Sequence, residues 1–217
     1  MCPPVRENGE RNLMRKLLPC IAIAAIVFTG AASAETLVSN LSQPVSGGYD
    51  CYYSQWFVSP FVTDAQDWNL VSVTLRLTPL EMPSNQSIVW IFADNGSGHP
   101  SNSRIAALIN PSLPIGVAGD YTFTASPPIL LEPNTRYYVA LGSDVIPIQR
   151  SHWNTTTSTS FSGTGVKPFL AYIDTGRDFD WNYTRDYYTM MFAVEVESAT
   201  VSTEKKTWGA IKSLYGQ

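Results

Sequence analysis

Apolar and polar residues alternate along short runs through most of the chain, and turn-forming residues separate these runs. In the clearest run, residues 70–78, Val71, Val73, Leu75 and Leu77 share one face while polar side chains occupy the other. An alternation with a period of two predicts a strand with one buried face. The same pattern predicts further strands at residues 36–39, 55–63, 87–93, 105–109, 121–125, 135–143, 168–173 and 188–197.

About nine short strands, separated by turns and with almost no helical periodicity, are typical of an antiparallel β-sandwich of the jelly-roll kind. Residues 94–98 and 132–134 carry the Asp, Asn, Gly and Pro residues that favour tight turns. Residues 144–166 lack a clear alternation and are rich in Ser, Thr and Gly. There we expect either a long surface loop or a polar edge strand.

The N-terminal part of the chain has the pattern of a secretory signal peptide. A short basic segment at 14–16 precedes an apolar run at 17–30, and small residues follow at 32–34. This order predicts cleavage before Glu35. The apolar run is shorter than the roughly 20 residues that a membrane-spanning helix needs. We therefore expect an N-terminal extension and signal peptide over 1–34, and a mature protein that is extracellular or at the cell surface, without a membrane span.

Composition supports a folded mature domain and excludes several classes of protein. The chain of 217 residues is 44% hydrophobic and 12% aromatic, too apolar for a disordered protein. Its net charge of -4 becomes -6 once residues 1–34 are removed, which argues against a nucleic-acid partner. Cys51 would then be the remaining cysteine, so we expect a buried or half-buried thiol and no internal disulfide. We assign residues 35–198 to one β-sandwich domain.

After residue 198 the chain changes character, and we assign 199–217 to a linker and an amphipathic tail. Trp208, Ile211 and Tyr215 follow a helical spacing, which predicts a short helix with one apolar face. One hypothesis is a sorting or docking tag that contacts export or anchoring machinery. The other is a helix packed on its own domain.

The residues that nucleophilic catalysis needs are scarce. His99 and His152 are the histidines, no Gly-x-Ser-x-Gly sequence occurs, and no spacing singles out a pair of carboxylates. We expect His99 to be an exposed turn residue. The sequence therefore predicts neither catalytic residues nor an enzyme, and it implies no cofactor.

Three aspartates form the best candidate for a metal site. Asp174, Asp178 and Asp180 lie within seven positions of one another and offer the hard oxygen ligands that calcium prefers. Their spacing departs from the EF-hand pattern, and Arg177 would compete for the carboxylates. These features favour solvated turn residues, with calcium as the alternative hypothesis.

Aromatic side chains provide the best argument for ligand binding, because Trp and Tyr stack on sugar and peptide surfaces. The candidate ligand-binding residues lie in the segments predicted as loops: His152, Trp153, Trp181, Tyr183 and Tyr187. The competing interpretation is that the aromatic residues among them cap the core. Three other tryptophans lie in or near predicted strands and are expected to fill the core: Trp56, Trp68 and Trp90.

The order of several motifs resembles a known family. They are Leu-Val-Ser-Asn at 37–40, Gln-Trp-Phe at 55–57, Leu-x-Ser-Val-Thr-Leu-x-Leu at 70–77, Asp-Asn-Gly-Ser-Gly-His-Pro at 94–100 and Leu-x-Pro-Asn-Thr-x-Tyr-Tyr-Val-x-Leu at 131–141. Over residues 37–197 the chain resembles the choice-of-anchor R domain of secreted bacterial proteins. The resemblance implies an exported β-sandwich followed by a variable C-terminal anchor, and it implies no reaction or catalytic residues.

Together these observations favour an exported, non-enzymatic binding or adhesion module whose partner is a glycan or a surface protein. One alternative is a carbohydrate-binding module or weak glycan hydrolase. Another is a structural surface subunit, in which an exposed edge strand pairs with a neighbour.

Overall fold

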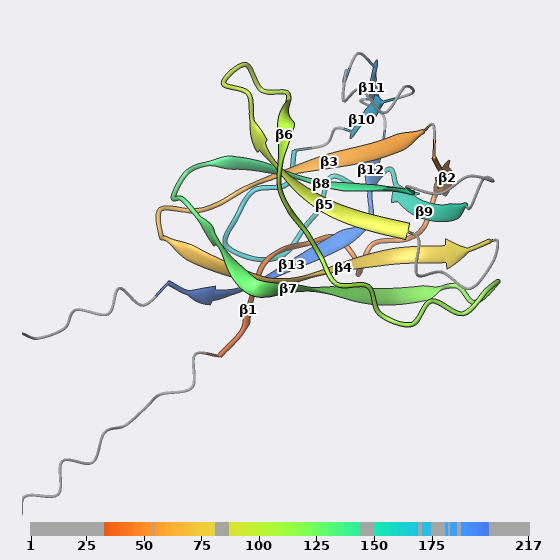
Figure 1. Cartoon of the computed structure of the whole chain (residues 1–217), viewed down its shortest axis with the longest axis horizontal. Helices are drawn as coiled ribbons and strands as arrows, with labels where there is room; N and C mark the ends of the chain where they lie inside the picture. Colours follow the sequence, from red (N-terminus) through yellow and green to blue (C-terminus); the bar gives the residue numbers. More distant parts are fainter. Residues whose placement is uncertain are drawn as a thin grey trace, which may run out of the picture. The chain divides into compact units, whose positions relative to one another are not determined.

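Antiparallel strands form two sheets in the computed structural model, which describes residues 33–53, 55–80, 87–143, 150–168, 171–174, 181, 183–185 and 188–199 (Figure 1). The larger sheet has seven strands: β1 (Glu35–Ser39), β2 (Gly47–Cys51), β4 (Trp68–Pro79), β7 (Gly119–Leu131), β9 (Ser151–Thr156), β12 (Thr189–Met190) and β13 (Phe192–Ser198). The smaller sheet has six: β3 (Trp56–Val62), β5 (Ser87–Asp94), β6 (Pro100–Ala107), β8 (Arg136–Ser143), β10 (Ala171–Asp174) and β11 (Tyr183–Arg185).

The strand order confirms the prediction of an all-β, antiparallel fold. The larger sheet runs β1-β13-β4-β9-β12, with β2 beside β9 and β7 beside β4, and the smaller runs β11-β10-β3-β8-β5-β6. The described residues include no helix. The predicted signal peptide up to residue 32 and the tail residues Trp208, Ile211 and Tyr215 lie outside the described residues.

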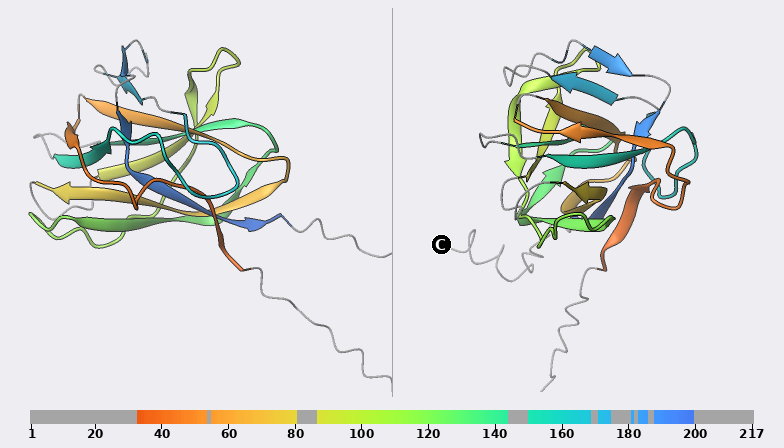
Figure 2. Two further views of the ribbon diagram at one scale, coloured as in Figure 1. Left: turned by 180° about the vertical axis from the view of Figure 1, so that it is seen from behind. Right: turned by 90° about the vertical axis from the view of Figure 1, so that its right-hand side faces the viewer.

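The two sheets lie one over the other and share an apolar core (Figures 1 and 2). Phe61 on β3 stacks on Tyr137 of β8 at 5.8 Å between ring centroids and meets Phe192 of β13 edge-on at 6.5 Å. Contacts of this kind join the smaller sheet to the larger one, because β13 belongs to the latter. The predicted core residues Trp56, Trp68 and Trp90 are at most 3% exposed; Trp68 belongs to this core, whereas Trp56 and Trp90 pack in a second apolar cluster on the smaller sheet.

A β-bulge changes the burial pattern of β4. Leu70, Val73, Leu75 and Leu77 are fully buried, but Val71 is half-buried. Glu195 of β13 pairs with Ser72 and the next residue, Val196, pairs with Leu70, which leaves Val71 as an extra residue in β4. The prediction that Val71 shares the buried face was therefore wrong, because a bulge interrupts the two-residue period.

An interior strand lies where the sequence predicted a loop or an edge strand. β9 pairs with β2 on one side and with β4 and β12 on the other. Its residues alternate up to Thr155, with Trp153 and Thr155 buried and His152 and Asn154 half-buried, and Thr156 is buried as well. The sequence does not show this period because Ser151 and Thr155, on the buried face, are polar like the residues on the outer face.

Local backbone contacts shield two sheet edges. Ser39 of β1 exchanges hydrogen bonds with Ser162 at 2.8 and 2.7 Å, and Thr124 of β7 exchanges them with Ile109 at 3.1 and 2.8 Å. β7 also contains Pro127 and Pro128, which have no N–H to donate. These features hinder pairing with another chain along β1 and β7.

Candidate functional site

Trp153, a predicted ligand-binding residue, lies in the core between the sheets. Its side chain is 0% exposed, and its Nε1 donates a 2.9 Å hydrogen bond to the backbone oxygen of Met191. Phe192 packs beside it with 6.3 Å between ring centroids. A buried ring has no face for a ligand, so the core interpretation holds for Trp153 and the stacking hypothesis does not.

Trp181 is also mostly covered, at 5% exposed, and lies on the outer face of the smaller sheet. It meets Phe92 edge-on at 5.4 Å in a cluster that includes Trp56 and Trp90, whose rings stack at 4.4 Å. This cluster gives the six-stranded sheet an apolar layer outside the main core. Trp181 caps that layer, as the competing interpretation expected.

The other predicted site residues fall at or beyond the limits of the described structure. Tyr183 begins β11 and Asp174 ends β10. Tyr187, Asp178 and Asp180 lie outside the described residues, so the calcium hypothesis stays a prediction. Among the residues that the structure does describe, no three His, Cys, Asp or Glu side chains are grouped so that they could hold a metal ion.

His152 joins β9 to β2 through a hydrogen bond to Asp50 on the outer face of the larger sheet. Its Nδ1 lies 2.8 Å from Oδ1 of Asp50, and Arg150 Nη1 lies 3.6 Å from Oδ2 of the same carboxylate. The carboxylate orients the imidazole, as it does in catalytic dyads. In the described part of the chain no hydroxyl or thiol is hydrogen-bonded to His152, so the geometry shows an oriented histidine without a nucleophile.

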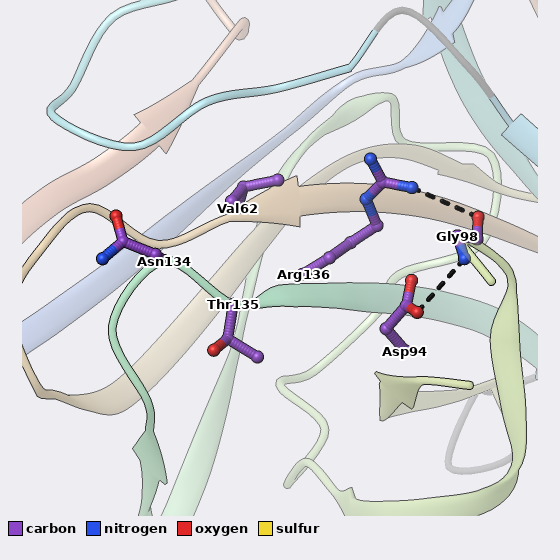
Figure 3. Close-up of a pocket in the computed structure, with 6 residues that line it drawn as sticks. All are labelled: Val62, Asp94, Gly98, Asn134, Thr135 and Arg136. Atoms are coloured by element: carbon purple, nitrogen blue, oxygen red, sulfur yellow. Dashed lines mark hydrogen bonds between the residues drawn. The ribbon is translucent and has the colours of Figure 1, made fainter. Parts of the chain in front are cut away.

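A pocket opens at one end of the smaller sheet, where β3 and β5 end and β8 begins. Its volume is about 430 Å³, and Figure 3 shows the residues that line it: Val62, Asp94, Gly98, Asn134, Thr135 and Arg136. They come from the last residue of β3, the turn between β5 and β6, and the turn that enters β8. Strand pairing between β3, β5 and β8 brings these three segments together.

Asp94 fixes the turn on one side of the pocket. Its Oδ1 accepts hydrogen bonds from the backbone N–H groups of Gly96 at 2.6 Å and Gly98 at 3.2 Å, and its Oδ2 accepts one from the Tyr138 hydroxyl at 2.8 Å. Burial raises the pKa of Asp94, but these hydrogen bonds and the charge of Arg136 outweigh burial and hold the pKa below its ordinary value. Asp94 is therefore ionised at neutral pH, and both its oxygens have partners within the protein.

Arg136 supplies the cationic wall of the pocket. Its Nη1 donates a 3.3 Å hydrogen bond to the backbone oxygen of Gly98. Gly98 has a φ of 82°, and a Cβ atom there would lie 2.8 Å from Nη1, so glycine both permits the turn and leaves space for the guanidinium. This is the one side-chain hydrogen bond of Arg136 among the described residues, so Nε and Nη2 have no protein partner there.

Asn134 and Thr135 form the opposite side of the pocket (Figure 3). Asn134 adopts a φ of 51° and donates its backbone N–H to Asp64 at 2.6 Å, while its side chain is exposed. Thr135 Oγ1 donates to the backbone oxygen of Pro133 at 2.9 Å, which leaves its lone pairs as acceptors. Guanidinium, amide and hydroxyl groups around one apolar side chain suit a ligand with several polar groups.

These pocket residues were not among the sequence-predicted site residues. The two segments that supply them were recognised as turns, at 94–98 and 132–134, but turn chemistry alone carried no sign of a shared site. The pocket forms only because β8 pairs with β3 and β5, which are distant in sequence. No local sequence pattern predicts that these residues share a site.

Two other reactive side chains are enclosed in the protein. Cys51 is 2% exposed, as expected, and burial together with the charge of Asp50 raises the pKa of its thiol well above 9.0. Lys167 is 6% exposed, and burial lowers the pKa of its amine well below the ordinary value of 10.5. Because both side chains are covered, neither is accessible to a substrate. His99, by contrast, is exposed in its turn, as expected.

Neither a comparison with protein-family models nor one with curated proteins finds a match to this chain. No helix within the described residues is long and apolar enough to cross a membrane. The pocket chemistry and the sequence features thus carry the functional argument.

Proposed function

We propose that this protein is an exported β-sandwich of the jelly-roll kind that acts as a non-enzymatic binding or adhesion module at the bacterial cell surface or in the extracellular space. The observation that carries the proposal is the pocket, where the Arg136 guanidinium donates to the backbone oxygen of Gly98 and makes no other side-chain hydrogen bond among the described residues. A group presented in this way is suited to recognition of a ligand.

Export is supported by the leader pattern and by the position of the first strand. β1 begins at Glu35, the residue after the predicted cleavage position, so removal of residues 1–34 would leave every described strand intact. The resemblance to the choice-of-anchor R domain agrees with this role. Fractionation of expressing cells tests it, since processed protein outside the cytoplasm is expected and full-length protein confined to the cytoplasm would contradict it.

A carbohydrate ligand is the favoured variant of this function. Asn134, Thr135 and Arg136 present an amide, a hydroxyl and a guanidinium around a pocket with Val62 as its apolar wall. A sugar ring offers hydroxyl groups to such donors and acceptors and a small apolar face to a valine. The tail with Trp208, Ile211 and Tyr215 belongs to the same proposal as a docking helix, which deletion of residues 203–217 tests through the location of the protein.

A pocket-filling variant tests the binding function. Val62→Phe would place a larger side chain in the pocket, while Val117→Phe makes the same change at a half-exposed site that lies near Pro79, at the far end of β4. Both variants and the wild type are passed over immobilised neutral and acidic polysaccharides and intact bacterial cells. We expect at least one surface to retain the wild type and Val117→Phe, with about tenfold weaker retention of Val62→Phe.

Two results would count against the proposal. Equal retention of Val62→Phe and the wild type would show that binding does not use the pocket. A folded wild-type protein that no surface retains would contradict a binding or adhesion role.

A further inference from the structure

The surroundings of Arg136 indicate which chemical group the pocket receives. Within the described part of the chain no carboxylate oxygen lies within 4.0 Å of a guanidinium nitrogen of Arg136. The contact that holds the guanidinium is the neutral backbone oxygen of Gly98. Arg76, on the other sheet, shows the contrasting arrangement, since Asp120 binds it through two hydrogen bonds of 2.7 and 2.8 Å.

Asp94 is the nearest candidate for neutralising Arg136, but its oxygen atoms are engaged elsewhere. Three hydrogen bonds, from two backbone N–H groups and the Tyr138 hydroxyl, already occupy its carboxylate. Asp94 therefore fixes the turn and interacts with Arg136 through its charge. It forms no hydrogen bond with the guanidinium. Nε and Nη2 of Arg136 have no hydrogen-bond partner among the described residues, and an edge of the guanidinium with two such donors can pair with a carboxylate through two parallel hydrogen bonds.

Resting on the binding function proposed above, we infer that the pocket takes an acidic saccharide, whose carboxylate pairs with Arg136 while ring hydroxyl groups contact Asn134 and Thr135. The lining favours a sugar over a peptide because four of its six residues carry polar side chains, and Val62 supplies the one apolar side chain. Peptide sites use an apolar groove or an open strand edge for affinity. Here the pocket lies at the ends of strands that already have partners on both sides, β3 and β8.

The test compares a short oligogalacturonate with its methyl ester, which keeps the sugar and removes the charge. Binding to the full mature chain is measured by titration calorimetry for the wild type, Arg136→Gln, Arg136→Lys and Arg76→Gln. Arg76→Gln is the matched control, because it removes the same charge from a surface ion pair on the other sheet. A poly-glutamate peptide serves as the acidic probe without sugar.

We expect the wild type to bind the acid about 10- to 100-fold more tightly than the ester, as hydrogen bonds to a charged group predict. Arg136→Gln should lose that preference, Arg136→Lys should keep part of it, and Arg76→Gln should behave as the wild type. Comparison of the two ligands on the wild type does not depend on whether any variant folds.

Three outcomes would overturn the inference. Equal binding of acid and ester, still weakened by Val62→Phe, would refute the acidic ligand while leaving the binding function in place. Poly-glutamate binding as tight as that of oligogalacturonate would replace the saccharide with an acidic peptide. Absence of binding to oligogalacturonate, in a protein that other surfaces retain, would refute the saccharide class, whereas absence of retention on every surface refutes the proposed function itself.

Discussion

Replacing Lys167 with methionine should stabilise the protein. The amine lies between the sheets, 3.1 Å from the Ser59 hydroxyl on β3 and 3.8 Å from the centre of the Phe192 ring on β13. No carboxylate among the described residues forms an ion pair with it. The methionine side chain has a similar length and packs well in apolar cores. Ser59 would keep a hydrogen bond with the Thr189 hydroxyl, which lies 3.4 Å away.

The cost of burying this amine has an upper limit, because Lys167 can always lose its proton. The ordinary pKa of lysine, 10.5, lies about 3.5 pH units above pH 7, and each unit corresponds to about 1.4 kcal/mol. Burial therefore costs at most about 5 kcal/mol. The hydrogen bond to Ser59 returns about 1 kcal/mol, and the Phe192 ring adds up to about 2 kcal/mol only while the amine keeps its proton. Lys167→Met should thus raise the free energy of unfolding by about 1–3 kcal/mol at pH 7.

The pH dependence gives the same prediction a second readout. Between the lowered pKa of folded Lys167 and 10.5, the unfolded chain binds more protons, so stability rises with pH by up to about 1.4 kcal/mol per unit. Burial raises the pKa of Cys51 and Tyr137, and these groups instead lower stability as the pH passes their ordinary values of 9.0 and 10.0. They are present in both proteins, so the difference between wild type and Lys167→Met isolates the lysine.

Urea unfolding at several pH values between 7 and 9 measures this difference. The difference in the free energy of unfolding between Lys167→Met and the wild type should be largest near pH 7. It should become smaller as the pH rises towards 9. Arg150→Met, which removes a cation that is 41% exposed, should change stability by less than about 1 kcal/mol. A Lys167→Met protein less stable than the wild type at pH 7 would refute the reasoning.

Three further changes probe the core. Gly142→Ala would place a Cβ atom within the Trp56 ring and should cost about 1–3 kcal/mol, seen as a lower melting temperature; unchanged melting would contradict the packing. Trp153→Phe removes the donor to Met191 and should cost about 1–3 kcal/mol in urea unfolding, whereas a loss of ligand binding without a loss of stability would restore the stacking hypothesis. The Cys51 thiol should resist iodoacetamide at pH 8 in the folded protein and react in urea, and fast labelling of the folded protein would show that it is accessible.

Strand positions could be predicted where one face is apolar and the other polar. β4 and β8 follow from this alternation, but the half-buried position of Val71 does not, because a bulge depends on the partner strand β13. β9 was missed because the Thr and Ser residues around Trp153 have no apolar contrast, although its pairing places it inside the sheet. The pattern of a strand is local, whereas its position in the sheet is set by its neighbours.

The candidate site could be predicted from the sequence even less well than the strands. The sequence pointed to aromatic residues as ligand-binding candidates. Trp153 and Trp181 instead lie in apolar clusters, because burying their large apolar surface stabilises the fold. The pocket instead uses Asp94, Asn134 and Arg136, which occupy turn and strand-end positions of ordinary composition. The pairing of β8 with β3 and β5 brings these residues together, and their spacing in the sequence does not predict that pairing.

Pairing between β1 and β13 also bears on how the chain folds. Thr36 and Glu195, which are hydrogen-bonded across these strands, are 159 positions apart, so the first strand of the larger sheet finds its partner only when the last one has been made. Closing a loop of this length has an entropic cost that precedes any gain from the contact, and such topologies fold slowly. For a chain proposed to leave the cytoplasm, this delay would keep it unfolded long enough to pass through a translocation channel, and the sheet would close on the far side of the membrane.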